Sequence, residues 1–491
     1  MKKYIFIVLF GIIFADRSRL DISFYDQVEV NSYRDEQALI DFIESVMESN
    51  MIPGVSVSVV KDGAIVWDKH LGYASIDDAV EVDENTMFML ASVSKTVTAT
   101  ALMQLWEQGL FDLDDNINDY LPFNFSHPDY FLAPISFKML LSHTSGINDN
   151  WGVMPYADGD SQLELGYYLE EYLVPGGLFY DSNSNFTNAM PGTSYSYSNI
   201  GTALIGYLVE SISGQPFNEY CNENIFEPLG MTNAFWFLSE IDSLSQVALP
   251  HVFEGGSGSS CYEIGCGIFN GSNPCQCDEA CVDYGDCCLD YDEVCGENGT
   301  GSDGVNLVEH YHYGYSDYPS GQLRVSSNDL AKFMGAYING GSYNGVRILD
   351  SDTVELIKTV HYPNIQSSQG LIWYYKNSNG RNLFGHNGGD TGVSTDMFIS
   401  LSDNLGVIVL TNSGNYSGMV QIENAVFSFA EETVFTTIGD INSDQTIDIL
   451  DIVLMVGIVL GDSDYNDIAD MNSDQVVDIL DIVFLVNIIL E

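Results

Sequence analysis

The chain has 491 residues, of which 45% are hydrophobic, and its 70 acidic and 15 basic residues give a formal net charge of −55. That length is too great for one compact core and suggests about two to four domains. The charge excludes binding of nucleic acid or anionic lipid through a broad basic face, and it is compatible with salty surroundings or with bound cations.

The first residues have the composition of a secretory signal. Residues 1–15, MKKYIFIVLFGIIFA, carry two lysines, then an apolar run, then a small residue. An uncleaved membrane anchor is the alternative, but the run is short for a membrane span. We therefore expect a secreted, cell-surface or periplasmic protein with no transmembrane segment after signal cleavage, in a compartment where disulfides are allowed.

Residues 35–435 combine helical and strand patterns. Apolar residues alternate on both sides of Lys61-Asp62-Gly63, which is typical of a β-hairpin over 53–74, and residues 395–413 predict two more strands around a turn. Apolar residues recur at helical spacing in 35–49, 96–110, 199–214 and 420–434. This order predicts an α+β domain, with one antiparallel sheet completed by both ends of the domain and a helical region beside it.

The segment ASVSKT, residues 91–96, places Ser92 and Lys95 three residues apart, on one face of a helix. A serine hydroxyl becomes a nucleophile when a base takes its proton, and lysine is a base only where burial or another cation lowers its pKa. A tyrosine could share that proton, and Tyr197-Ser198-Asn199 precedes another predicted helix. The alternatives are that Ser92 only caps its helix and that the second motif is an ordinary turn.

Residues 261–295 interrupt this domain and contain eight of the nine cysteines, between the linker-like stretches GGSGSS and GENGTGSDG. So short a segment cannot bury a sufficient core, so the cysteines predict a disulfide-stapled module; a metal site is the alternative. The spacing, above all CQCDEAC followed by DCCLDY, resembles the somatomedin B domain. The resemblance implies disulfides among Cys261, Cys266, Cys275, Cys277, Cys281, Cys287, Cys288 and Cys295, and a possible protein partner. Cys221 is left over, and we expect it to be a buried thiol.

A third motif, His386-Asn387-Gly388, precedes a segment that we expect to be an edge strand. Such a strand can supply a backbone N–H that holds the oxyanion of an acyl-transfer reaction. The alternative is that His386 is a structural histidine.

The tail is a repeat with a period of 30 residues, over 439–461 and 469–491. Each copy places oxygen-bearing side chains at loop positions 1, 3, 5, 9 and 12, with a backbone carbonyl expected at position 7, as in calcium-binding loops. The alternative is an acidic, solvated loop. A loop followed by one apolar helix resembles the type I dockerin module, although position 6 holds Gln445 and Gln475 where glycine is usual. The predicted calcium ligands are Asp440, Asn442, Asp444, Thr446, Asp448 and Asp451 in one loop, and Asp470, Asn472, Asp474, Val476, Asp478 and Asp481 in the other.

Between residues 35 and 435, outside the insert, the chain resembles the serine β-lactamase-like family. The resemblance rests on Ser-x-x-Lys, Tyr-x-Asn and His-x-Gly in this order, and on IPGVSVSVVKDGAIVW, LLSHTSGI, IFEPLGMTNA and YPSGQLRVSSNDLAKF. It implies that Ser92 is acylated, that Lys95 and Tyr197 share the acid and base work, and that Asn199 orients the substrate. His386 and Gly388 would form the third element, and the N–H groups of Ser92 and Gly389 would hold the oxyanion.

We therefore expect an exported serine hydrolase that forms an acyl-enzyme on an ester, amide or peptide and needs no cofactor for catalysis. A true β-lactamase or D-Ala carboxypeptidase is one alternative. An adhesion or scaffold protein that uses the hydrolase fold as a binding platform is another. The resemblance of the tail implies a cohesin-like or cell-surface protein partner.

Overall fold

The computed structural model describes residues 36–254 and 306–433 and, in the tail, residues 439, 441–442, 447–461, 467–471 and 476–490. Those residues form two units, one ending at Ser428 and one beginning at Phe429. Several predictions lie outside the described residues: the signal segment 1–15, the cysteine-rich insert 261–295, and the calcium ligands Asp440, Asp444, Thr446, Asn472 and Asp474.

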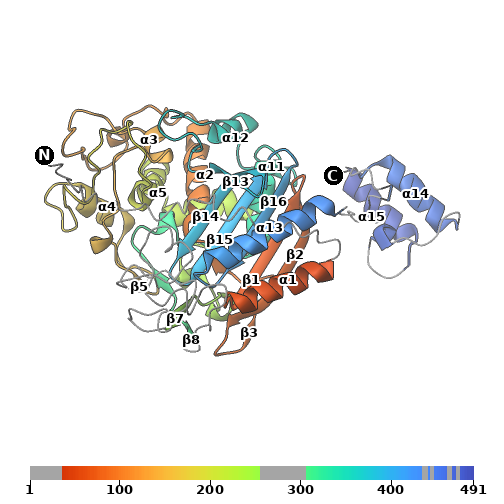
Figure 1. Ribbon diagram of the computed structural model, residues 1–491. Coiled ribbons are helices and arrows are strands. Elements are labelled where there is room, and N and C mark those ends of the chain that lie inside the picture. Colours follow the sequence, from red (N-terminus) through yellow and green to blue (C-terminus); the bar gives the residue numbers. More distant parts are fainter. Residues whose placement is uncertain are drawn as a thin grey trace, which may run out of the picture. The chain divides into compact units, whose positions relative to one another are not determined.

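A seven-stranded antiparallel sheet forms the centre of the first unit (Figure 1). Its strand order is β13-β14-β15-β16-β1-β2-β3, so β1 (Gly54–Lys61), near the start of the unit, pairs with β16 (Leu405–Thr411), near its end. This confirms the prediction of an antiparallel sheet that both ends of the domain complete. The other strands are β2 (Ala64–Ser75), β3 (Val80–Glu81), β13 (Tyr374–Ser378), β14 (Arg381–Asp390) and β15 (Val393–Ser400).

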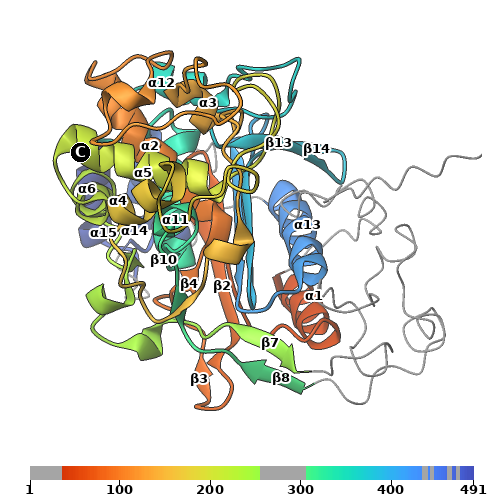
Figure 2. The same ribbon diagram turned by 90° about the vertical axis from the view of Figure 1, so that its left-hand side faces the viewer.

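The predicted hairpin is also confirmed. β1 and β2 join through Asp62 and Gly63, both with positive φ, which matches the right-handed twist of the paired strands. Every residue of β15 and β16 is buried, because helices cover both faces of the sheet. On one face lie α1 (Glu36–Ser49) and α13 (Tyr416–Glu432), and on the other lies α11 (Ser327–Ile338) with the helical region behind it (Figure 2).

The apolar spacing of each helix accounts for the face that it buries. In α1, Leu39, Ile43, Val46 and Met47 recur every three or four residues and are the buried side chains. α2 (Ser94–Glu107) is buried from Ser94 to Leu105, since it lies between the sheet and α5 (Asn199–Ser213). The other helices of the unit are α3 (Phe137–Leu141), α4 (Leu165–Leu173), α6 (Phe217–Cys221), α7 (Glu227–Leu229) and α12 (Ser351–Lys358).

Small sheets of two or three strands complete the unit, and the strands of one pair flank the insert in the sequence. β7 (His251–Glu254) pairs antiparallel with β8 (Asn306–Glu309), so the chain leaves and returns at neighbouring strands. Cys221 is a free, fully buried thiol, as predicted. The remaining short strands are β4 (Phe88–Met89), β5 (Ala157–Asp158), β6 (Ala234–Phe235), β9 (Tyr313–Gly314), β10 (Arg324–Val325), β11 (Ser342–Tyr343) and β12 (Val346–Arg347).

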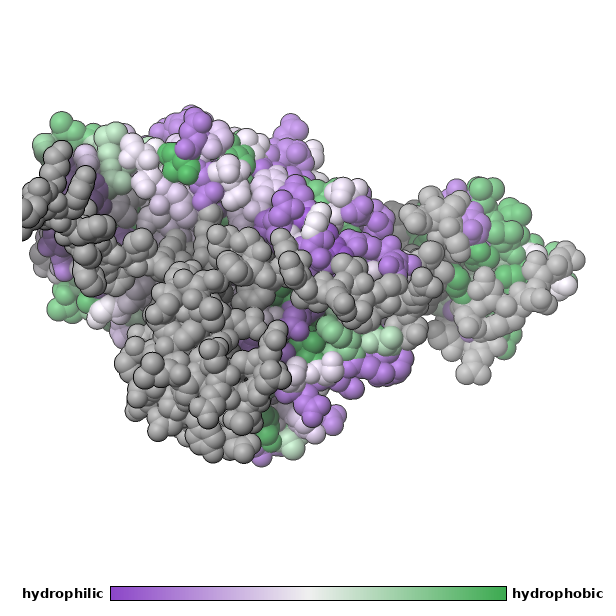
Figure 3. Space-filling model, viewed as in Figure 1, coloured by the Kyte–Doolittle hydropathy of each residue, from purple (hydrophilic) through white to green (hydrophobic). Residues whose placement is uncertain are grey.

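The tail unit contains α14 (Ile449–Val459) and α15 (Ile479–Leu490), which meet around Met455, Ala469 and Leu485. Large apolar side chains also lie exposed at equivalent positions of the two repeats, and Figure 3 shows the resulting hydrophobic surface. They are Ile449, Leu450, Val453 and Leu454 in the first repeat, and Ile479, Leu480, Val483 and Phe484 in the second.

Both described loop ends of the tail have the same internal bonds. Asp451 is fully buried, and its carboxylate accepts from the backbone N–H groups of Ile441 and Asp448, each at 2.8 Å. Asp481 does the same with Met471 and Asp478, at 2.8 and 2.7 Å. The predicted position-12 ligands therefore close both loops. Among the residues that the structure describes, no three acidic, histidine or cysteine side chains come together as a metal site, so calcium binding by the tail stays a prediction. Across all described residues, no helix combines the length and apolar character needed to cross a membrane.

Candidate active site

Ser92 lies in a tight turn at the start of α2. The 3-10 turn η2 (Ala91–Val93) precedes the helix, and Ala91 has φ +47°, a left-handed conformation that is strained for alanine. The N-cap residue of α2 is Val93, so the alternative in which Ser92 caps the helix is wrong. The expectation that Ser92 is part of the helix itself is also corrected. From Ala91 to Leu105, Ser92 is the one residue that is not buried.

Lys95 is fully buried, and its ammonium group has three oxygen partners. Nζ lies 3.0 Å from Ser92 Oγ, 2.7 Å from Asn199 Oδ1 and 2.5 Å from the carbonyl oxygen of Ser320. A charged lysine donates to all three. A neutral lysine has two N–H bonds and one lone pair, and of the three partners only the Ser92 hydroxyl has a proton to give. In the neutral state, the lone pair is therefore satisfied by Ser92.

The environment of Lys95 favours that neutral state. Removal from water lowers the pKa of Lys95 to about 7, against the opposing influence of the carboxylates of Asp149, Asp317 and Asp390. Asp317 is buried and accepts from Ser320 Oγ at 2.9 Å, and burial raises the pKa of Asp317 to about 6. Near neutral pH, Lys95 can therefore change its protonation state.

Tyr197 lies beside this pair, as the sequence predicted. Lys95 Nζ is 4.9 Å from the centre of the Tyr197 ring. The ring centre of Tyr197 is 4.5 Å from that of His143 and 6.2 Å from that of His386. The fold therefore brings together Ser92, Lys95, Tyr197 and His386, which come from three separate parts of the sequence.

Asn199 is the first residue of α5, and it is held by a residue that the sequence analysis missed. Both the backbone N–H and the side-chain amide of Asn199 donate to Asp149 Oδ2 at 2.9 Å. Asp149 Oδ1 accepts from the Ile200 N–H at 3.1 Å and from Ser198 Oγ at 3.2 Å. Burial raises the pKa of Asp149, while these N–H bonds oppose that rise. Asp149 lies two residues after LLSHTSGI, which ends at Ile147, and this position was the available signal.

The third motif lies inside β14 and not before an edge strand, so that prediction is corrected. β13 is the edge strand, and it pairs with β14 only as far as Gly385. The segment from His386 to Asp390 therefore extends beyond β13. His386 is buried, its Nδ1 lies 2.6 Å from the Asn387 carbonyl oxygen, and its ring meets the Tyr374 ring edge-on at 5.3 Å.

Gly388 brings β14 against the turn that carries Ser92. A methyl group there would lie 2.2 Å from the Leu90 carbonyl oxygen, 2.4 Å from Thr395 Oγ1 and 3.1 Å from the Ser92 nitrogen. No side chain fits into that space, so only glycine allows this approach. Gly389, by contrast, is exposed, and a methyl group there would meet nothing within 4 Å. Ser92 and Gly389 are thus on adjoining backbone segments, one of them open to solvent.

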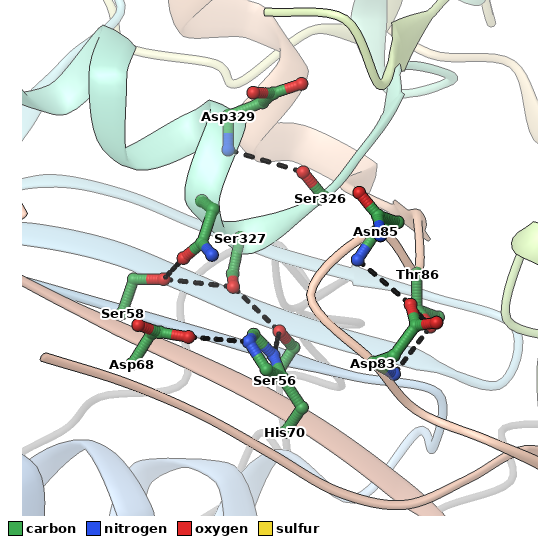
Figure 4. Close-up of polar contacts among 11 residues, drawn as sticks. Ser56, Ser58, Asp68, His70, Asp83, Asn85, Thr86, Ser326, Ser327 and Asp329 are labelled. Carbon is green, nitrogen blue, oxygen red and sulfur yellow. Dashed lines mark hydrogen bonds and ion pairs between the residues drawn. The ribbon is translucent and has the colours of Figure 1, made fainter. Parts of the chain in front are cut away.

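Away from this site, another serine lies in a cluster with a histidine and an aspartate (Figure 4). His70 Nδ1 lies 2.8 Å from Ser56 Oγ, and His70 Nε2 lies 2.7 Å from Asp68 Oδ2. Ser56 is 1% exposed, and its hydroxyl also bonds to Ser327 Oγ at 2.7 Å. Because substrate cannot reach Ser56, this cluster ties β1 to the start of α11 and is no second active centre.

The sequence profile of the family described as Beta-lactamase matches residues 39–426. The chain is 28% identical over 200 residues to Protein flp of Staphylococcus aureus (strain MRSA252), covering 40% of this chain and 38% of that protein. It is 30% identical over 179 residues to the putative penicillin-binding protein PbpX of Bacillus subtilis (strain 168), covering 36% and 40%. The chain thus spans about two fifths of the length of these curated relatives.

Solved structures share the fold. A D-amino acid amidase from Ochrobactrum anthropi SV3 superposes with a TM-score of 0.57 at 19% identity, over 80% of this chain and 98% of that one. An octameric penicillin-binding protein homologue from Pyrococcus abyssi gives 0.56 at 22% identity, over 81% and 77%. A β-lactamase/D-alanine carboxypeptidase from Pseudomonas syringae gives 0.54 at 18% identity, over 80% and 99%. At these identities, the likeness concerns the fold alone.

Proposed function

The chain belongs to the beta-lactamase family of serine hydrolases, and we propose that it cleaves an ester, amide or peptide bond through an acyl-enzyme on Ser92. One observation carries the proposal. Lys95 Nζ has three oxygen partners, and Ser92 is the only one that can return a proton to it. A lysine whose pKa burial lowers to about 7 is a suitable base for that proton near neutral pH.

The proposed reaction has two halves. In the first, the Ser92 hydroxyl proton passes to Lys95 Nζ while Oγ bonds to the carbonyl carbon of the substrate. As the tetrahedral adduct collapses, the bond to the leaving group breaks and the leaving group receives that proton, with Tyr197 assisting the transfer. In the second half, a water molecule gives its proton to Lys95 and attacks the acyl carbon, which releases the acid and restores Ser92.

The negative charge of each tetrahedral adduct needs donors that are already in place. We assign these to the N–H groups of Ser92 and Gly389, and the packing of Gly388 against η2 supports the assignment because it brings the two backbones together. Asn199 would orient the substrate, with its own position set by Asp149.

The alternatives are a true β-lactamase or D-Ala carboxypeptidase, and a scaffold without hydrolase activity. Antibiotics and terminal D-residues present a carboxylate, which a fixed positive charge would bind. In β-lactamases and penicillin-binding proteins of this fold, a lysine of the third motif supplies that charge. Here the motif carries His386 instead, which favours esters and N-terminal peptides over β-lactams. The fully buried Lys95 disfavours the scaffold, because removing an amine from water costs stability and a binding platform has no use for an amine that contacts Ser92 Oγ.

The signal-like start, the cysteine-rich insert and the tail would place this activity outside the cytoplasm and next to a partner. The signal-like residues 1–15 and the eight cysteines of 261–295 are consistent with export and with a somatomedin B-like module. The tail would bind calcium and dock to a cohesin-like or cell-surface protein. The equivalent apolar side chains that α14 and α15 expose support such a partner, since patches of that kind mark interaction sites.

Turnover of three chromogenic substrates separates these possibilities. We expect release of p-nitrophenol from a short-chain p-nitrophenyl ester and slower release from D-alanyl p-nitroanilide, with nitrocefin the poorest substrate at neutral pH. Nitrocefin as the best substrate would establish the β-lactamase alternative. Turnover of none of the three, by protein of normal thermal stability, would support the scaffold.

A further inference from the structure

A carboxylate lies on the strand that carries the third motif. Side chains alternate along a strand, so Asp390 is on the same face of β14 as His386 and Gly388. Gly388 is the residue that contacts the Ser92 backbone, and Asp390 follows it by two residues, roughly 7 Å along the strand. Asp390 is therefore on the face of β14 that is directed at Ser92, one residue beyond the expected oxyanion donor Gly389.

Asp390 is held in a fixed position at this place. Tyr156 Oη and the Thr391 N–H both donate to its Oδ1, each at 2.7 Å. The Tyr156 ring meets the Tyr313 ring edge-on at 4.9 Å, and Tyr313 Oη in turn donates to the Thr391 carbonyl oxygen at 2.8 Å. Tyr156 is 45% exposed, so this group lies where a substrate can reach it. Both bonds use one oxygen of the carboxylate.

The charge around Lys95 is negative. Asp149, Asp317 and Asp390 all act on the lysine. Asp149 accepts from the start of α5, and Asp317 is buried and accepts from Ser320, whereas Asp390 is partly exposed. Removal from water raises the pKa of Asp390, against the opposing bonds from Tyr156, the Thr391 N–H and Tyr313. A substrate carboxylate would be repelled at this position, and a cation would be attracted.

We propose that Asp390 binds a protonated amine on the carbon next to the scissile carbonyl, so that the preferred substrates are α-amino amides, α-amino esters and N-terminal peptides. The order of residues along β14 supports this class. Gly389 would hold the carbonyl oxygen, and Asp390 is the next residue, about 3.4 Å further along the strand, so the carboxylate belongs to the neighbour of the proposed oxyanion donor. The inference rests on the proposed function and names its substrate class.

The test compares alanine p-nitroanilides whose amine is free, acetylated or succinylated, at about pH 7, where an α-amine is mostly protonated. The three differ in charge at one position: positive, neutral and negative. We expect wild-type kcat/KM to be about tenfold or more higher for the free amine than for the acetylated substrate, and lowest for the succinylated one. This order needs no variant, so it stands even if substitutions at Asp390 fail to fold.

Asp390→Asn keeps the oxygen that Tyr156 and Thr391 bond and removes the charge. The free-amine preference should fall to nearly one, and the succinylated substrate should improve, a gain that loss of structure cannot produce. Asp352→Asn, at an exposed position of α12, is the matched control and should keep the wild-type order. Because each ratio is taken within one variant, a change in the pKa of Lys95 cancels.

The two proposals fail in different ways. Turnover of all three substrates at similar rates, or a preference that survives in Asp390→Asn, would overturn the inference and leave the hydrolase intact. No turnover of these anilides or of a p-nitrophenyl ester, by correctly folded protein, would overturn the proposed function and the inference with it.

Discussion

Asn199 and Asp149 are joined twice, because the backbone N–H and the side-chain amide of Asn199 donate to the same carboxylate oxygen at 2.9 Å. The oxygen of the same amide, Asn199 Oδ1, accepts from Lys95 Nζ at 2.7 Å. By holding Asn199, Asp149 determines the position of one hydrogen-bond acceptor of Lys95. Its hydrogen bonds go to the start of α5 and not to Ser92. This makes Asp149 a positioning residue.

The first prediction concerns Asp149→Asn. The new side-chain NH₂ group would face the N–H groups of Asn199 and Ile200, which also donate. Asn199 should therefore move, and kcat should fall about tenfold to a hundredfold. Asp149 also raises the pKa of Lys95, so loss of its charge should shift the rising limb of the pH–rate profile to lower pH. The measurement is kcat and KM for a p-nitrophenyl ester across pH. If the rising limb of the pH–rate profile and kcat were both unchanged in Asp149→Asn, Asp149 would not be a positioning residue.

The second prediction concerns the base. Since the neutral form of Lys95 accepts the serine proton, kcat/KM should rise with pH and reach half its maximum near pH 7, as Lys95 loses its proton. Lys95→Arg keeps the charge at every accessible pH and should lose about a hundredfold or more in rate. A flat wild-type profile from about pH 5.5 to about pH 8.5 would remove Lys95 from the role of base.

The third prediction concerns His386. Lysine is charged throughout the neutral range, whereas histidine ordinarily titrates near pH 6.5. His386→Lys should therefore add a charged hydrogen bond to a substrate carboxylate, worth about 1.5 to 3 kcal/mol, and raise kcat/KM for nitrocefin relative to a p-nitrophenyl ester. If the substitution left that ratio unchanged in a folded, active variant, the histidine would not explain the choice of substrate.

The fourth prediction concerns calcium in the tail. Asp451 and Asp481 already close their loops, and a cation would relieve the repulsion among the neighbouring carboxylates, so binding should stabilise the fold. Limited proteolysis of the full chain, read by mass spectrometry, should cut beyond residue 433 readily in EGTA and slowly in calcium. The double variant Asp451→Asn, Asp481→Asn should show less protection. Equal cutting of the wild type in both conditions would contradict calcium binding.

Local patterns predicted a large part of this fold. The spacing of Leu39 and Ile43 in α1, and the turn at Asp62 and Gly63, depend on neighbouring residues, and the structure has both where the sequence placed them. The nearness of Lys95 to Ser92 was equally predictable, because three residues separate them. Tyr197 and His386 were predicted through the order of motifs, and the fold brings Tyr197 to Lys95 and His386 to Tyr197.

The rest depends on contacts between distant parts of the chain. Asp149 lies in a loop, and it contacts the start of α5 through Asn199, which is 50 residues away in the sequence. The placement of His386 within β14 was missed because strand order cannot be read from one strand alone. The turn at Ala91 was missed because alanine rarely takes positive φ, and contacts with distant residues hold it there: β14 packs against η2, and Leu90 bonds to Leu323 and Thr395.

Intact-mass analysis of the protein after incubation with a fluorophosphonate, compared with Ser92→Ala, tests the central claim most directly. Ser92 is the one residue of η2 and the first turns of α2 that is not buried, and it lies 3.0 Å from Lys95 Nζ. The account predicts one adduct per wild-type chain, mapped to the peptide that contains Ser92, and none on Ser92→Ala of equal thermal stability. An adduct of the same mass on Ser92→Ala, or wild-type turnover by that variant, would contradict it.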